Sequence, residues 1–378
     1  MLKKRLTALL LTAALAVTSF AGCSGGQAAS SAASLAVASS TVASSSQPAS
    51  SESETVSFTD SAGRTVEISK NITKIAPSGA LAQVFLYSLC PDKLVGLSGK
   101  FSDDAKKYVD QKYWSLPVFG QFYGKNVSLN IEALAAAHPQ IIIDIGEKKG
   151  TEKEDMDGVQ KQTGIPVVFV EATLGSISQA YLTLGDILNE KDQAQKLSDY
   201  CKFTLDDAKQ KSASIPQDKR VKVYYGLGKD GLQTNPKGSI HADVIDLIGA
   251  VNVADIPNTQ GSGGNNVSME QVMKWAPDAI IFDPGSAYGS IGSNKLWKDF
   301  AAVKSSRVYE VPIGPYNWMG RPPSINRLLG VKWLGNLLYP DVYKYDMVKE
   351  AKDFYQLFYH YSLSDDGAKA LMKNSTEK

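Results

Sequence analysis

The sequence contains little cysteine or histidine and has almost no net charge. Its 378 residues include three of each of these residue types, at Cys23, Cys90 and Cys201 and at His138, His241 and His360. Because no two of them form a CxxC or HxxxH pair, a zinc-cluster protein is disfavoured. The 40 Lys and Arg residues are balanced by 39 Asp and Glu, for a formal charge of +1. Nucleic-acid binding depends on clustered positive charge, so we expect no nucleic-acid partner.

The sequence also lacks the common catalytic signatures. Catalysis by side chains needs a nucleophile with a base, or a pair of carboxylates, within reach of each other. No GxSxG, HExxH or Cys-with-His motif occurs. We therefore predict a protein that is not an enzyme and has no cofactor. The composition, 43% hydrophobic and 21% charged, is that of an ordinary globular protein, and the length favours two packed lobes.

The first 22 residues have the pattern of a secretory signal. Three basic residues, Lys3 to Arg5, precede an uncharged run from Leu6 to Phe20, which ends in the small residues Ala21 and Gly22. Cys23 follows directly, and this resembles a bacterial lipoprotein signal, in which the cysteine is diacylated after cleavage. The alternative is a plain secretory signal with an incidental cysteine. The lipoprotein interpretation implies a chain that is anchored in the bilayer through acylated Cys23, on the extracytoplasmic face of the cell membrane.

A low-complexity segment follows the predicted signal. From Ser24 to Ser53, 20 of 30 residues are Ser or Ala, and none is aromatic or basic. Such a segment cannot bury enough apolar surface to fold, so we predict a flexible tether over residues 23–54. Removing the signal also removes three basic residues and no acidic one, which leaves the mature chain slightly acidic.

From Thr55 onward the sequence is typical of an α/β protein. Alternating apolar residues at Val56–Phe58 and Thr65–Ile68 flank a turn and predict a hairpin. Helical patterns separate most of the further strand candidates, which indicates mostly parallel sheets. These candidates are Ile72–Ala76, Leu94–Leu97, Ile141–Ile145, Val167–Val170, Val221–Tyr225, Ile280–Asp283 and Val308–Val311.

One long stretch contains no strand candidate. Between Ser176 and Ser212 the apolar residues recur only at helical spacing. We therefore predict an N-terminal α/β lobe over residues 55–173, a linking helical segment over 174–214 and a C-terminal α/β lobe over 215–378.

An internal repeat relates the two predicted lobes. Asn130-Ile131-Glu132 opens a helix that ends at Pro139, and Ser268-Met269-Glu270 opens one that ends at Pro277. Each glutamate precedes its proline by seven residues. Asn and Ser are good N-caps, and a glutamate in the first turn meets the positive end of the helix dipole, so one interpretation is simply two well-capped helices. The repeat also indicates that each lobe contains the same helix–strand unit.

Together these motifs resemble the substrate-binding lipoproteins of ABC importers for iron-siderophores, haem and cobalamin. The resemblance extends from about Val56 to Tyr361 and includes the strand end Ile75–Ser78, the two repeated units and the segment Gly238–Ala250. It implies two α/β lobes joined by one long helix, a ligand cleft between the lobes and only slight closure on the ligand. It also implies a monomer that delivers its ligand to a permease dimer in the membrane, docking through Glu132 and Glu270.

We expect the ligand contacts in loops at the carboxyl ends of strands, where α/β sheets bind ligands. This rule selects Ser78 and Tyr225. It also selects the loop 313–323, which holds Tyr316, Asn317, Trp318 and Arg321. Aromatic rings pack against a planar chelate and a guanidinium pairs with an anionic group. The alternative is that the two rings cap the core and the arginine pairs with a structural carboxylate.

Three further residues are candidates for the same cleft. Tyr123 and Lys125 lie in a glycine-flanked loop of the first lobe, which is otherwise an ordinary surface loop. His241 precedes the predicted helix Asp243–Ile248 and is otherwise a capping or core histidine.

The resemblance leaves the ligand open. We favour an iron chelate, either a ferric siderophore or haem. Cobalamin or another corrinoid, molybdate or tungstate, and a nickel chelate are alternatives. The scarcity of histidine argues against a bare transition metal held by several imidazoles. A more distant alternative is a structural or adhesion lipoprotein of the cell surface that binds no small molecule.

Overall fold

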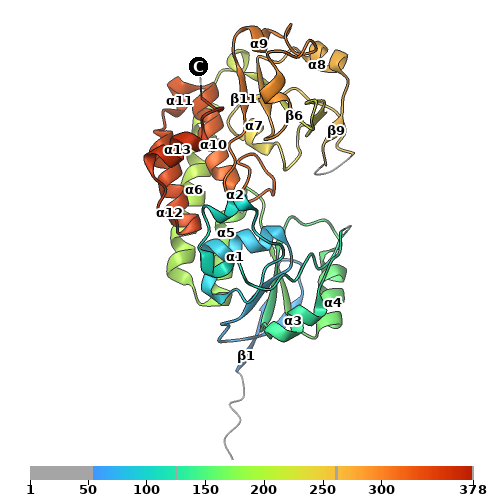
Figure 1. Cartoon of the computed structure of the whole chain (residues 1–378). Helices are drawn as coiled ribbons and strands as arrows, with labels where there is room; N and C mark the ends of the chain where they lie inside the picture. The colour runs from blue at the N-terminus through green and yellow to red at the C-terminus, as the bar shows by residue number, and fades with distance from the viewer. Residues whose placement is uncertain (1–53, 125, 260–262, 377–378) are drawn as a thin grey trace, which may run out of the picture. The chain divides into compact units, whose positions relative to one another are not determined.

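The computed structural model describes residues 54–124, 126–259 and 263–376 (Figure 1). The predicted signal over residues 1–22, the lipidation candidate Cys23, nearly all of the predicted tether and the candidate Lys125 lie outside the described residues. The described chain confirms the predicted fold class, since two α/β lobes each contain a sheet with parallel strands.

The first lobe is built on a hairpin and a small parallel sheet. The hairpin pairs β1 (Thr55–Thr59) with β2 (Thr65–Ser69), and the sheet has the order β3 (Ile75–Pro77), β4 (Ile141–Gly146), β5 (Val167–Glu171). The apolar run of β4 is buried on both faces, as is typical of a parallel strand. Helices of this lobe are α1 (Ala80–Leu89), α2 (Asp103–Lys106), α3 (Ile131–Ala137) and α4 (Glu152–Thr163).

One predicted strand of this lobe does not form. Leu94 bridges Ile75, whereas Leu97 bridges Val118. The segment Leu94–Leu97 therefore joins two different neighbours instead of forming a ladder with one of them.

The second lobe contains a larger mixed sheet. In the described residues its strand order is β11-β10-β6-β7-β9, and β8 also pairs with β6. The strands are β6 (Lys222–Leu227), β7 (Gln233–Thr234), β8 (Val251–Asn252), β9 (Asn265–Asn266), β10 (Ala279–Phe282) and β11 (Val308–Glu310). β10 runs parallel to both β6 and β11, while β7 is antiparallel to β6. The helices α7 (Asp243–Leu247), α8 (Met269–Trp275) and α9 (Ala301–Lys304) accompany this sheet.

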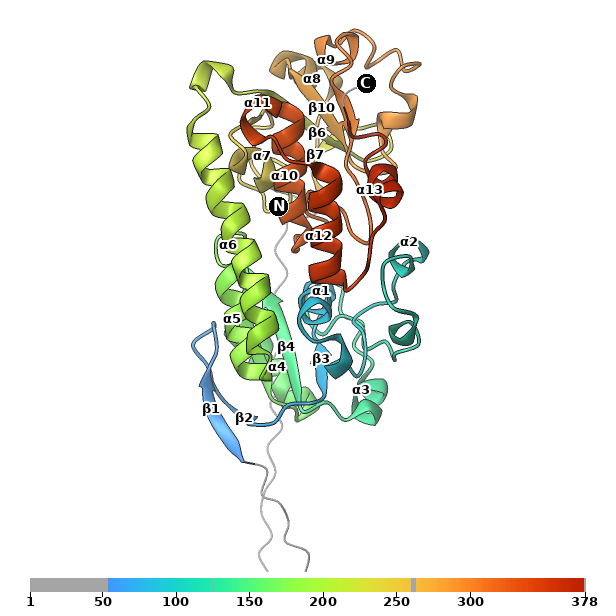
Figure 2. The same cartoon turned by 90° about the vertical axis from the view of Figure 1, so that its left-hand side faces the viewer.

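A helical hairpin links the two lobes. α5 (Ile177–Leu188) turns at Asn189 into α6 (Lys191–Ala213), and the two helices pack against each other. With 23 residues, α6 is about 35 Å long. It contacts α1 of the first lobe as well as α7 of the second, and Figure 2 shows it running beside both. This confirms the predicted long linking helix.

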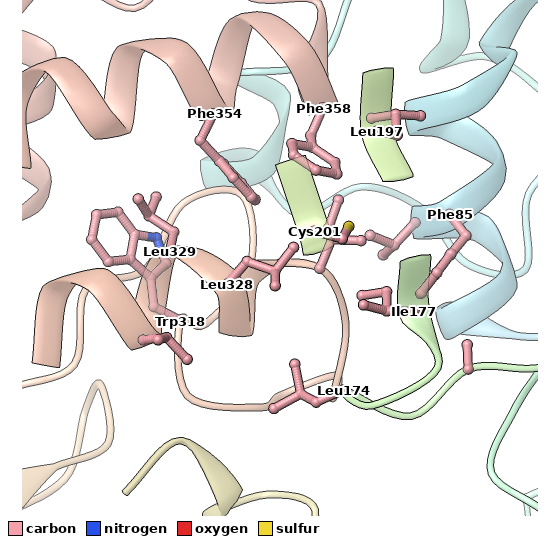
Figure 3. Packing of buried hydrophobic residues seen from close by; sticks show 14 of the residues in the cluster. Phe85, Leu174, Ile177, Leu197, Cys201, Trp318, Leu328, Leu329, Phe354 and Phe358 are labelled. Carbon is pink, nitrogen blue, oxygen red and sulfur yellow. The ribbon is translucent and has the colours of Figure 1, made fainter. Parts of the chain in front are cut away.

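The C-terminal helices make a second connection that the sequence did not predict. They are α10 (Asn326–Leu338), α11 (Pro340–Tyr343), α12 (Met347–Tyr359) and α13 (Asp365–Leu371). α12 packs on α1 of the first lobe. Figure 3 shows the resulting core, in which Phe85 of α1, Cys201 of α6, Leu328 of α10 and Phe358 of α12 belong to one buried cluster. One hydrophobic core therefore extends through both lobes. No described helix has the length and apolar composition needed to cross a membrane.

Candidate functional site

A cavity of about 390 Å³ lies between the two lobes. This volume is within the range of about 300–1,000 Å³ that is typical of small-molecule sites. The first lobe lines it with Ser78 and Gly79 after β3, with Asp144, Glu147 and Lys149 in and after β4, and with Gln121 and Tyr123 of the segment before α3. The second lobe contributes Ile240, His241, Pro322, Pro323 and Arg327. The rule that ligands bind at the carboxyl ends of strands therefore leads to this cavity.

On the wall of the first lobe, two predicted contact residues share a buried carboxylate. Asp144, at the end of β4, is only 3% exposed. Its Oδ1 accepts a hydrogen bond from the Ser78 hydroxyl, and its Oδ2 accepts one from the Tyr123 hydroxyl at 2.7 Å. Burial raises the pKa of Asp144, and these two hydrogen bonds oppose the rise. Because both hydroxyl protons point to Asp144, the hydroxyl oxygens keep lone pairs for a ligand.

On the wall of the second lobe, His241 presents one ring nitrogen. Its Nδ1 lies 2.6 Å from the backbone oxygen of Gly320. A carbonyl oxygen only accepts hydrogen bonds, so Nδ1 carries the proton and Nε2 holds a lone pair. Burial lowers the pKa of His241, which favours the neutral ring. Gly320 has φ of +152°, and a Cβ there would lie 3.1 Å from the His241 Cα, so this close approach requires glycine.

A second carboxylate, the half-buried Asp283, joins other predicted contact residues in the second lobe. The Oδ1 of Asp283 accepts hydrogen bonds from the Tyr225 hydroxyl at 2.6 Å and from Asn317 Nδ2 at 2.7 Å. Arg321 NH1 lies 3.9 Å from Asp283 Oδ2. Burial raises the pKa of Asp283. The Asn317 Oδ1 also accepts from the Gly320 amide at 3.1 Å, so the cluster connects to the carbonyl that orients His241.

The structure thus divides most of the predicted ligand residues into two groups. Ser78, Tyr123 and His241 line the cavity, whereas Tyr225, Asn317 and Arg321 gather around Asp283. The remaining two are core residues in this conformation. Trp318 is fully buried with its ring centroid 6.5 Å from that of Trp333. Tyr316 is half-buried, with its ring centroid 6.5 Å from that of Tyr359.

The two predicted docking residues occupy equivalent places in the two lobes. Glu132 and Glu270 are exposed in the first turns of α3 and α8. The side chains of Asn130 and Ser268 cap these helices, accepting from backbone amides at 3.0 and 3.2 Å. Both helices have seven residues and end at a residue with a left-handed backbone. The repeat found in the sequence is therefore a repeat of structure.

Sequence reasoning did not assign Asp144 to the site and named Asp283 only as the start of one of the loops that follow strands, although a stronger signal was present. The repeated unit continues through each strand to a carboxylate, from Pro139 to Asp144 in the first lobe and from Pro277 to Asp283 in the second. Each carboxylate accepts a hydrogen bond from a tyrosine hydroxyl. Extending the repeat by one strand would have found both.

Arg327 and Asp243 were also missed, and no local signal marks them. Arg327 lies in the almost wholly buried helix α10, where its NH1 is 2.6 Å from Asp243 Oδ2. Among the described residues, no group of three or more His, Cys, Asp or Glu side chains could hold a metal ion. The cavity therefore offers one imidazole lone pair from one lobe and two hydroxyl oxygens from the other. These few electron-pair donors suit a ligand that contains an electron-poor centre. Most of the atoms that coordinate this centre would then belong to the ligand itself.

Comparison with known proteins identifies relatives of this chain. It is 26% identical over 220 residues to the high-affinity heme uptake system protein IsdE of Staphylococcus aureus, covering 55% of this chain and 71% of the relative. It is 24% identical over 265 residues to the molybdate-binding protein MolA of Haemophilus influenzae, covering 64% of this chain and 73% of that protein. Among solved structures, an ABC transporter solute binding protein from Sulfurospirillum deleyianum superposes with a TM-score of 0.77. Its sequence identity is 30%, and the match covers 84% of this chain and 99% of that one.

A family model described as "Periplasmic binding protein" matches residues 82–313, which is more than half of the chain. The match includes most of both lobes and the helices that link them. The chain therefore belongs to the periplasmic binding protein family, whose members are the substrate-binding components of ABC importers and not enzymes.

Proposed function

We propose that this protein captures an iron chelate, a ferric siderophore or haem, in the cavity between its lobes and delivers it to an ABC permease. The observation that carries the proposal is that His241 lines the cavity while its Nδ1 is bonded to the Gly320 carbonyl oxygen, which leaves the lone pair of the neutral ring on Nε2. Imidazole nitrogen is a good ligand for iron. One imidazole supplies one bond, so the remaining coordination positions must be filled by the chelator. The relative IsdE is named for heme uptake.

The opposite wall supports a chelate over a free oxyanion. The hydroxyl protons of Ser78 and Tyr123 are used by Asp144, so this wall faces the ligand with lone pairs. An oxyanion such as molybdate has only acceptor atoms and binds best to donors. Lys149 also lines the cavity, and its ammonium group suits a carboxylate of haem or of a chelator. Corrinoids, nickel chelates and molybdate, for which the relative MolA is named, are the alternatives to be tested in parallel.

A ligand panel tests the proposal. The chain from Ser24 onward is titrated with haemin, a ferric catecholate, cyanocobalamin and molybdate, and binding is followed by quenching of tryptophan fluorescence. We expect an iron chelate to bind and His241→Ala to weaken this binding about tenfold or more, the effect of losing an interaction of about 1.4 kcal/mol. His138→Ala is the matched control, because His138 is exposed at the end of α3 and outside the cavity.

Two results would overturn the proposal. One is tight binding of cyanocobalamin or molybdate while both iron chelates fail. The other is binding of an iron chelate that His241→Ala leaves unchanged. If no member of the panel raises the melting temperature at saturating concentration, the surface-lipoprotein alternative gains support, because a ligand of the native state must stabilise it.

We also propose that Cys23 is acylated and that residues 23–54 tether the lobes to the membrane. The support is the sequence pattern of residues 1–23. In a bacterial host, the full chain is expected to partition into the detergent phase of Triton X-114, because two acyl chains anchor a protein stably. Cys23→Ala is expected to move it to the aqueous phase. A Cys23→Ala variant that stays in the detergent phase would refute the anchor.

A further inference from the structure

We propose that Arg327, paired with Asp243, is a positioning residue that holds His241 with its Nε2 toward the cavity. The inference rests on the proposed role of His241 in ligand binding. It assigns a function to a buried guanidinium that does not itself need to contact the ligand.

Arg327 joins two separate segments of the second lobe. NH1 donates to Asp243 Oδ2 at 2.6 Å and to the backbone oxygen of Ile240 at 3.3 Å. NH2 donates to the backbone oxygen of Pro323 at 2.8 Å, and Nε donates to that of Ser324 at 3.3 Å. The side chain is only 3% exposed. A single rigid group therefore has four hydrogen bonds, two to each segment.

His241 lies inside the first of these segments. Ile240 directly precedes it and Asp243 follows two positions later, so Arg327 fixes the backbone on both sides of the histidine. The second segment begins close to Gly320, whose carbonyl oxygen accepts the His241 Nδ1 proton. The orientation of the ring therefore depends on the spacing of the two segments that Arg327 holds together.

The geometry requires arginine and not merely a positive charge. The planar guanidinium presents donors in fixed directions, so it can bond a carboxylate on one side and two carbonyl groups on the other. A lysine is a point charge on a flexible stem and cannot keep all four contacts at once. Asp243 is the matching acceptor, since NH1 bonds both Asp243 and Ile240, the residues on either side of His241 in the sequence.

The tautomer of His241 in the ligand-free protein is the direct readout. The chain has only three histidines, so ¹⁵N–¹H imidazole spectra of the chain from Ser24 onward can be assigned with His138→Gln and His360→Gln. We expect a single Nδ1–H tautomer for His241 in the parent. In Arg327→Lys and in Asp243→Asn we expect a mixture of tautomers, together with at least tenfold weaker binding of haemin.

Lys332→Met is the matched control. Lys332 lies in the same helix, is also 3% exposed and pairs with Glu350 at 2.6 Å, but it does not line the cavity. Its loss removes a buried ion pair of the same kind and is expected to leave the His241 tautomer unchanged.

Several outcomes would overturn the inference. These are an Nε2–H tautomer in the parent, unchanged His241 signals in folded Arg327→Lys and Asp243→Asn, or an equal change in Lys332→Met. If Arg327→Lys does not fold, Asp243→Asn gives the same readout with a nearly isosteric side chain. Because the tautomer is measured without ligand, a failure of haemin to bind the parent counts against the proposed function and leaves the positioning role to be decided by the spectra.

Discussion

At the scale of single residues, the protein buries polar groups in matched sets. Asp144 lies in the second half of β4, Asp283 directly follows β10, and each accepts a hydrogen bond from a tyrosine. A buried carboxylate is costly unless it is hydrogen-bonded, so these partners stabilise the carboxylates and also fix the tyrosines. The polar residues around the cavity are thus oriented before a ligand arrives, which reduces the entropy lost on binding.

The two described cysteines give a prediction at the same scale. Cys90 and Cys201 are free and buried. Burial raises the pKa of Cys90 to about 12 and that of Cys201 well above its ordinary value. Since only the thiolate reacts, we expect iodoacetamide at pH 8 to leave both thiols unmodified in the native chain from Ser24 onward and to modify both in guanidinium chloride. Intact mass spectrometry gives the count, and rapid modification of the native protein would contradict the burial.

At the scale of elements, the short helices α3 and α8 each have a capping residue and an exposed glutamate at their N-terminal ends. The side chains of Asn130 and Ser268 each already accept a hydrogen bond from one amide of the first turn. The carboxylates of Glu132 and Glu270 are exposed to solvent, so a partner can reach them. We therefore propose that capping and docking are roles of different residues in the same turn.

This separation predicts opposite effects of two double variants. Glu132→Ala/Glu270→Ala is expected to abolish most transport of the bound ligand in cells while ligand affinity and melting temperature stay unchanged. Asn130→Ala/Ser268→Ala is expected to lower the free energy of unfolding by about 1 kcal/mol per helix, as is typical of a lost N-cap, and to leave transport intact. Unimpaired transport by the folded glutamate variant would refute the docking role.

At the scale of the whole described unit, the two lobes have more than one connection. α6 contacts both of them. α12 packs on α1, and residues of these two helices belong to one hydrophobic core. A helix bends far less readily than an extended hinge, and a close-packed core resists deformation. We therefore infer that the lobes move little relative to each other.

Pulsed electron spin resonance between labels on Lys161→Cys and Lys274→Cys measures this motion. Both positions are exposed, one in each lobe, and the two native thiols are buried. We expect the ligand identified by the panel to change the distance by only a few ångströms. Lys202→Pro, in the middle of α6, is expected to broaden the distance distribution, because proline interrupts a helix, whereas Lys202→Ala is not. A ligand-induced change of about 10 Å, the width of a helix, would contradict this inference.

The sequence by itself determined the α/β class, the long helical link, the two capped helices and most strands. These features follow from local periodicity, cap residues and prolines, which act over a few neighbouring positions. Only the tertiary structure decided which polar side chains meet at the cavity. Trp318 and His241 both stood in plausible loops, yet one is packed against Trp333 and the other lines the cavity. Arg327 pairs with Asp243, which lies 84 positions away in the sequence. Burial and hydrogen bonding of this kind depend on chain segments that only folding brings together.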